Sequence, residues 1–179
     1  MSPVDERLEL LEIDLPVVMP PVVEGYAPAF APFVRSGDHI HLSGRLGKKD
    51  GKLLCGKVGD EITLEQGKLA ARDAAIELLA VLKSAVGDLN CVRKIVKLFV
   101  MVNSTPRFTE PHRIADGASE LLVQVFDERG QHARSAIGVA QVPFGACVEI
   151  EMIAEIQAAP TDTAAGSSHL HATLELPRN

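Results

Sequence analysis

Residues 132–156 contain the side chains best suited to chemistry, on two expected strands joined by a Pro-Phe-Gly turn. Because side chains alternate between faces along a strand, Arg134 falls opposite the branched residues Ile137 and Val139. Glu149 falls in the same way opposite the apolar row of the second strand. A guanidinium beside a carboxylate could bind an anionic ligand and supply a general acid or base. The pattern also describes a solvated face with a cross-strand ion pair, and most such pairs are structural.

The same stretch resembles a known family. Its motifs are similar to the C-terminal signature of the RidA/YjgF family, the reactive-intermediate deaminases, also called endoribonuclease L-PSP. The residues that carry the resemblance are Ala133-Arg134-Ser135, Pro143 and Val148-Glu149-Ile150-Glu151, with Leu42-Ser43-Gly44 and Asp116-Gly117-Ala118-Ser119 upstream. The resemblance covers residues 25–157, and the run His132 to Val139 is most similar to a branch with longer chains.

The resemblance implies a reaction and a set of site residues. The reaction is hydrolysis of enamine or imine intermediates, such as 2-aminoacrylate, to 2-keto acids and ammonia, with no cofactor and no metal. Arg134 would hold the substrate carboxylate, and Glu149 would hold or activate the attacking water. Ser43 and Gly44 would line the ligand cleft, where a glycine lets a ligand approach the backbone closely. Ala136 is expected in the same site.

Three further positions are expected at the ligand but depart from the family's pattern. Phe33 stands where the family has Tyr and lacks its hydroxyl. Arg45 stands where Gln is usual and would add a second cation. Asp116 stands where Asn is common, and a carboxylate cannot donate the hydrogen bond that an amide can. These departures keep a second hypothesis open, a non-catalytic trimer that binds a small carboxylate or has a regulatory role.

Composition narrows the possible partners. The net charge of −6 and the absence of Trp argue against a ribonuclease, which is a third hypothesis, and against other nucleic-acid binding. Three well-separated cysteines suit a reducing compartment, so a cytoplasmic protein is expected. No apolar stretch is long enough to span a membrane, and the N-terminus lacks the pattern of a secretory signal. The expected ligand is a small carboxylate or imino acid.

The elements that position these residues follow from local patterns. Thr63 and Gln66 form a capping box at the start of the clearest helix, which Gly87 ends. Toward the N-terminus we expect a helix from Ser2 with Leu8 and Leu11 buried, followed by a proline-rich arm to residue 32. A hairpin over 33–44 and a mobile loop over 47–60, with a short hairpin at Asp50-Gly51, should come next. The remaining elements are helices over 63–86 and 110–128, a strand over 92–102, and a disordered tail over 158–179.

The order of these elements predicts an α/β fold, a two-layer α+β sandwich with a mixed sheet and two main helices on one face. Residues 33–157 would form the domain, preceded by the arm of residues 1–32. His39 and His41 share a strand face, but no third ligand has recognisable spacing, so no metal site is expected.

The second face of the sheet is predicted to be small and apolar. It would carry Ala136, Gly138, Ala140 and Cys147, and a monomer would leave this patch in water. The resemblance implies a chorismate-mutase-like (bacillus) fold that forms homotrimers, with three sites in clefts between subunits. A homotrimer with closed cyclic symmetry is therefore expected.

Overall fold

The computed structural model describes residues 3–18 and 29–157 of the chain. The expected cap at Ser2, residues 19–28 of the arm and the tail over 158–179 lie outside the described residues. In chain order the elements are α1 (Pro3–Leu10), β1 (Phe33–Ser36), β2 (His39–Leu46), β3 (Lys48–Lys49), β4 (Lys52–Leu53), α2 (Leu64–Val86), η1 (Leu89–Cys91), β5 (Val92–Asn103), α3 (Pro111–Phe126), η2 (Asp127–Gly130), β6 (Ala133–Val139), η3 (Pro143–Gly145) and β7 (Val148–Ile156).

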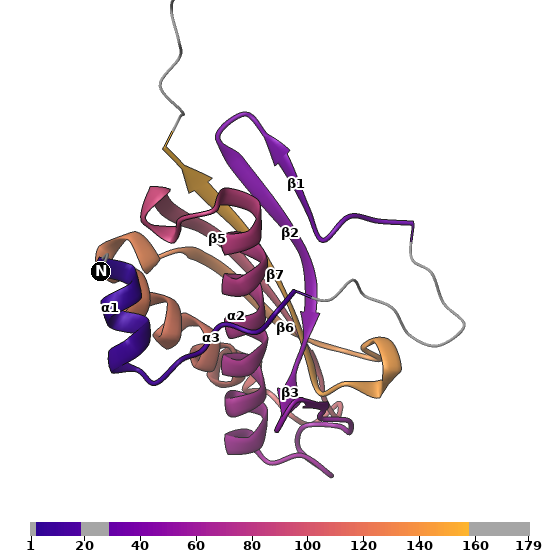
Figure 1. The fold of residues 1–179 in the computed structure, drawn as a ribbon. Coiled ribbons are helices and arrows are strands. Elements are labelled where there is room, and N and C mark those ends of the chain that lie inside the picture. Colours follow the sequence, from indigo (N-terminus) through magenta and orange to yellow (C-terminus); the bar gives the residue numbers. More distant parts are fainter. Residues whose placement is uncertain (1–2, 19–28, 158–179) are drawn as a thin grey trace, which may run out of the picture.

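Five of these strands form one mixed sheet in the order β1-β2-β7-β5-β6. All neighbours are antiparallel except β5 and β6, which are parallel and are connected through α3. Helices α2 and α3 both cover the same face of the sheet (Figure 1). The predicted two-layer sandwich is confirmed, as is the capping box between Thr63 and Gln66 at the start of α2.

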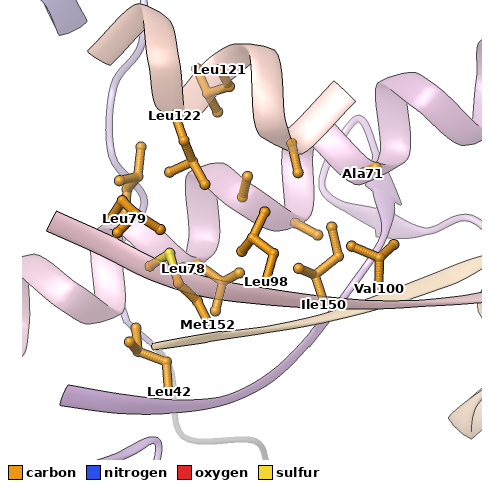
Figure 2. Close-up of a cluster of buried hydrophobic side chains, with 14 of the residues drawn as sticks. Leu42, Ala71, Leu78, Leu79, Leu98, Val100, Leu121, Leu122, Ile150 and Met152 are labelled. Carbon is orange, nitrogen blue, oxygen red and sulfur yellow. The ribbon is translucent and has the colours of Figure 1, made fainter. Parts of the chain in front are cut away.

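The core lies between the sheet and the two helices, and Figure 2 shows its centre. The strands contribute Leu42, Leu98, Val100, Ile150 and Met152, and the helices contribute Ala71, Leu78, Leu79, Leu121 and Leu122. Small residues let these layers approach closely. A Cβ on Gly117 of α3 would lie 2.0 Å from the carbonyl oxygen of Lys68 in α2, so the helix backbones meet at that point.

Strands β6 and β7 do not form a hairpin, although their sequence order suggested one. Strand β5 lies between them, because β7 inserts antiparallel between β2 and β5 while β6 pairs with the other edge of β5. The connection between them crosses the end of β5, where the Asn103 amide donates to the Cys147 carbonyl at 2.9 Å. A cross-strand ion pair between Arg134 and Glu149 is therefore wrong as an interpretation.

The open face of the sheet also differs from the prediction. Ala136 and Gly138 pair with Val100 and Val102 and so lie on the helix-covered face, and Cys147 is fully buried. The register instead brings larger and more charged residues to the open face. They include Leu46, Lys97, Phe99, Met101, Ser135, Ile137, Val139, Glu149, Glu151 and Ile153.

The segment over residues 47–60 is held by hydrogen bonds, in contrast to the expected mobile loop. The short hairpin is present as β3 and β4, with positive φ at both Asp50 and Gly51. Beyond it, the Cys147 amide donates to the Leu54 carbonyl at 2.8 Å, and Val58 is fully buried.

The N-terminal helix α1 packs on α3. Val4 and Leu8 are buried, which confirms the prediction for Leu8, and Leu11 is half-buried against the same core. Arg7 donates to the carbonyl of Val125 at 3.2 Å and forms an ion pair with Asp127.

Candidate active site

Arg134 is the second residue of β6 and lies on the helix-covered face, beside Leu98 of β5. Its Nη1 donates hydrogen bonds to Asp116 Oδ1 at 2.8 Å and to Ser119 Oγ at 3.0 Å. Asp116 and Ser119 are three residues apart on α3, a spacing that places them on one face of the helix. The side chain of Arg134 is 24% exposed, so solvent reaches a guanidinium that is nevertheless held in place.

These two hydrogen bonds leave one edge of the guanidinium open. Both involve Nη1, and among the described residues Nε and Nη2 of Arg134 have no hydrogen-bond partner. A carboxylate can accept two parallel hydrogen bonds from such an edge. Arg134 is thus oriented by its own chain and still offers a two-pronged donor to an anion.

Ser119 also links Arg134 to a histidine. The hydroxyl oxygen of Ser119 lies 3.0 Å from Nε2 of His132, and Nδ1 of the same ring lies 2.6 Å from the carbonyl oxygen of Gly130. Burial lowers the pKa of His132, and the positive charges of Arg134 and Lys94 lower it further against the opposing hydrogen bond to Gly130. The neutral imidazole is therefore favoured at neutral pH.

We call Asp116, Ser119, His132 and Arg134 the Arg134 cluster. Sequence reasoning assigned roles to Asp116 and Arg134 but none to Ser119 or His132. Their spacing carried a signal, because Ser119 is three residues beyond Asp116 on a helix and His132 is two residues before Arg134 at a strand start.

Glu149 lies on the open face of β7, between Leu46 of β2 and Met101 of β5. Its carboxylate sits against the backbone of Gly44, where an added Cβ would lie 2.0 Å from Oε1. A side chain at position 44 would therefore displace the carboxylate. The close approach to Gly44 that was expected of a ligand is made here by a side chain of the same protein.

The environment of Glu149 favours its neutral form. Burial raises the pKa of its carboxyl group, and the negative charge of Glu151 raises it further. No described residue donates a hydrogen bond to this carboxylate. A half-buried carboxylate with a raised pKa and no fixed donor is suited to exchange a proton with water. Ser43 precedes Gly44 in the sequence, and its hydroxyl donates to the carbonyl oxygen of Ala31 at 2.7 Å rather than to Glu149. We call Ser43, Gly44, Glu149 and Glu151 the Glu149 cluster.

A β-bulge builds this second cluster. Leu42 pairs with Met152 and Arg45 with Ile150, so Ser43 and Gly44 together oppose the single residue between those partners. The extra residue reverses the alternation of side chains along β2. Gly44 comes under Glu149 for that reason, and Arg45 turns to the helix-covered face.

Arg45 and Phe33 lie outside both clusters. Arg45 is 8% exposed, and its Nη2 has no hydrogen-bond partner among the described residues. Burial lowers the pKa of Arg45, an effect that the nearby charge of Glu77 opposes. Phe33 pairs with Leu42 on the helix-covered face and packs against the core. Both residues were expected at the ligand, but in the single chain they lie on the helix-covered face, away from Glu149.

The Arg134 and Glu149 clusters do not converge within one chain either. Arg134 and Met152 of β7 both pair with Leu98 of β5, whereas Glu149 lies three residues before Met152 on β7. The two side chains are also two strands apart and point to opposite faces of the sheet. Within one chain the two clusters therefore lie on different surfaces of the sheet. Ala136, also expected at the ligand, follows Arg134 on the covered face of β6.

Neither a metal site nor a membrane-spanning helix is found in the described part of the chain. No group of three or more His, Cys, Asp or Glu side chains there is arranged to hold an ion. The rings of His39 and His41 lie 6.5 Å apart on the open face. None of the described helices is long and apolar enough to cross a bilayer.

Comparison with known proteins decides the family. Residues 7–156 match the family model described as "YjgF/chorismate_mutase-like, putative endoribonuclease". The chain belongs to this family. The resemblance noted from the Arg134 and Glu149 motifs is thereby confirmed.

Individual relatives agree with this assignment. The chain is 43% identical over 152 residues to Protein TCP17 of Trypanosoma cruzi, covering 84% of this chain and 92% of that protein. The crystal structure of Atu1372 from Agrobacterium tumefaciens, a protein of unknown function, is 38% identical with a TM-score of 0.77, covering 87% of this chain and 93% of that one. RidA from the Antarctic bacterium Psychrobacter sp. PAMC 21119 is 26% identical with a TM-score of 0.50, covering 74% and 92%. Within the YjgF family the fold is therefore more similar to Atu1372 than to this RidA.

Proposed function

We propose that the protein hydrolyses small enamine or imine intermediates that carry a carboxylate, releasing a 2-keto acid and ammonia. The observation that carries the proposal is the held guanidinium of Arg134, whose Nε and Nη2 edge remains open to a carboxylate. The raised pKa of Glu149 supports it, because general bases act best when their pKa is close to the working pH.

The reaction divides between the two clusters. Arg134 would bind the substrate carboxylate and so fix the adjacent C=N carbon. Water then adds to that carbon, its oxygen forming the new C–O bond while one proton passes to the carboxylate of Glu149. Glu149 returns that proton to the nitrogen, which gives a carbinolamine. Glu149 then takes the hydroxyl proton and passes it to the amine nitrogen while the C=O double bond forms and the C–N bond breaks, so ammonia leaves with the 2-keto acid as the second product. An enamine substrate first takes a proton on its terminal carbon to become the imine.

This division requires two copies of the chain, and we propose a homotrimer with its sites between subunits. The Arg134 cluster of one copy would face the Glu149 cluster of the next. The apolar part of the open face supports the assembly, since Phe99 and Met101 are only partly buried and Ile137 is 43% exposed.

Release of 2-keto acid from enzymatically generated imino acids tests the activity. Arg134→Lys and Glu149→Gln should each release keto acid far more slowly than wild type, and Arg93→Lys and Glu155→Gln are matched controls because that pair lies on the sheet outside both clusters. Ligand binding without any acceleration of keto-acid release would overturn the proposal and leave a carboxylate-binding protein.

Mixing the two impaired variants tests whether the site spans two subunits. If each site takes Arg134 from one copy and Glu149 from its neighbour, refolding the variants together at equal amounts restores about a quarter of the sites in a cyclic trimer. If both residues acted within one chain, every site would lack one of them and no activity would return.

A further inference from the structure

For a neutral His132 imidazole, the hydrogen-bond directions in the Arg134 cluster follow from what each partner can donate or accept. The Gly130 carbonyl can only accept, so Nδ1 of His132 carries the ring hydrogen and Nε2 has a free lone pair. The Arg134 guanidinium can only donate, so the hydroxyl oxygen of Ser119 accepts from it. The hydroxyl hydrogen of Ser119 is then directed at Nε2 of His132.

This arrangement has the parts of an activated nucleophile. The base lies within hydrogen-bond distance of the hydroxyl, and a third group, the Gly130 carbonyl, fixes the ring tautomer. Nη1 of Arg134 would stabilise negative charge on the serine oxygen. Ser119 and His132 are each partly exposed in the single chain.

We propose that Ser119 and His132 form a nucleophile–base pair that hydrolyses small acyl esters, and that the open edge of Arg134 favours esters carrying a carboxylate. This activity is distinct from the proposed deamination. It shares only the anion-binding edge of Arg134, and it makes no use of Glu149.

The chemical steps use only groups of the chain and water. Ser119 Oγ forms a bond to the carbonyl carbon while its proton passes to Nε2 of His132. The bond from that carbon to the alcohol oxygen breaks, and the alcohol leaves with the proton from His132. Water then attacks the acyl-serine with His132 again taking the proton, which releases the acid and restores the hydroxyl of Ser119.

The alternative is a hydrogen-bond network that only fastens α3 to the start of β6. Ser84 and Ser135 provide the comparison, because neither hydroxyl is hydrogen-bonded to a histidine. The Ser84 hydroxyl donates to the carbonyl of Val81, and the Ser135 hydroxyl accepts from Lys97. A purely structural Ser119 should react with electrophiles no faster than these.

The test is covalent labelling of the full chain with a fluorophosphonate, read by mass spectrometry of the modified peptide. Wild type should be labelled at Ser119, and Ser84→Ala should be labelled at the same rate. His132→Gln keeps a polar side chain but removes the base, and should lower the labelling rate by about 100-fold or more. A wild type labelled no faster at Ser119 than at Ser84, or a rate that His132→Gln leaves unchanged, would overturn the proposal.

Hydrolysis of two p-nitrophenyl esters, the acetate and the hemisuccinate, tests the preference for an anion. Wild type should hydrolyse the hemisuccinate faster than the acetate, and Arg134→Lys should lower the ratio of these two rates. An equal ratio in both proteins would show that Arg134 does not select the anionic ester. Glu149→Gln separates this activity from deamination, because it should slow keto-acid release by about 10²- to 10⁴-fold and leave labelling of Ser119 intact. Thermal melts of each variant confirm that it is folded before its rates are compared.

Discussion

The Arg134 and Glu149 clusters lie on opposite faces of one sheet and differ in what is fixed, the position of a side chain in one and its pKa in the other. Arg134 donates two hydrogen bonds to side chains of α3 and forms an ion pair with Asp116, so its geometry is fixed before a ligand arrives. Glu149 has no hydrogen-bond donor among the described residues and is destabilised as an anion by burial and by Glu151. A binding group benefits from fixed geometry, whereas a proton-transfer group benefits from a shifted pKa. The fixed position of Arg134 and the raised pKa of Glu149 arise from different groups, so each can be disturbed alone.

The largest expected effect is on turnover when Glu149 is changed. Glu149→Gln keeps the size of the side chain but cannot accept a proton from water, so keto-acid release should fall by about 10²- to 10⁴-fold. Affinity for pyruvate, measured by calorimetry, should change little because Arg134 holds the carboxylate. Equal losses of turnover and affinity would mean that Glu149 acts in binding and that the division between the clusters is incorrect.

The next largest effect should be on affinity when Arg134 is changed. Arg134→Lys keeps the charge but loses the two-pronged edge, and the loss of one charge-assisted hydrogen bond should weaken carboxylate binding by about 1.5–3 kcal/mol, roughly tenfold to a hundredfold. Titration of 2-ketobutyrate into wild type and variant measures this, with Arg93→Lys as control. Unchanged affinity would show that Arg134 only joins β6 to α3 and does not bind the carboxylate.

A smaller effect is expected on stability when Gly44 is filled. Gly44→Ala places a Cβ in the space of the Glu149 carboxylate and should lower the free energy of unfolding by about 1–3 kcal/mol. Denaturant unfolding measures the loss. The double variant Gly44→Ala/Glu149→Ala should recover part of it, since the clashing atoms are gone. Additive losses in the double variant would show that the two residues do not compete for that space.

The smallest effect should be a pH-dependent gain in stability. A carboxyl group whose pKa is raised on folding stabilises the protein while it is protonated, below its unfolded pKa, and that stability is lost as pH rises through the folded pKa. Glu149→Gln stays neutral throughout. The variant should therefore be more stable than wild type at neutral pH, and the difference should vanish in acid below the unfolded pKa. Chemical denaturation at several pH values would detect it, and a constant difference would contradict the raised pKa.

Much of the fold was predictable because its signals are local. The helix from Leu64 to Val86 follows from its capping box and alanine-rich stripe, and the strands follow from period-two alternation. The insertion of β7 between β2 and β5 was not predictable from alternation, because periodicity assigns faces within a strand but not its neighbours. Because the neighbours of each strand were unknown, the predicted hairpin between β6 and β7 and the predicted residues of the open face were both wrong.

The site was predictable in its residue types more than in its arrangement. Arg134 and Glu149 were found from their motifs, and their separation came only from the sheet order. Strict alternation along β2 would put Arg45 on the same face as His41 and Ser43, and the bulge reverses it. Ser119 and His132 form their hydrogen bond between a helix and a strand, a contact that no single-element pattern contains.

The bulge in β2 has a consequence for the kinds of mutation that this strand tolerates. Deleting Ser43 or Gly44 would remove the bulge and restore one-to-one pairing, so Arg45 would still pair with Ile150 and stay on the helix-covered face. Deleting Gly44 would change only the surface beside Glu149, because it removes the backbone that the carboxylate lies against. A one-codon deletion elsewhere in β2 would instead shift the residues beyond it by one place relative to β7 and exchange their faces. The bulge is therefore where this strand can lose a residue and keep its core register, because the extra residue has no partner of its own on β7.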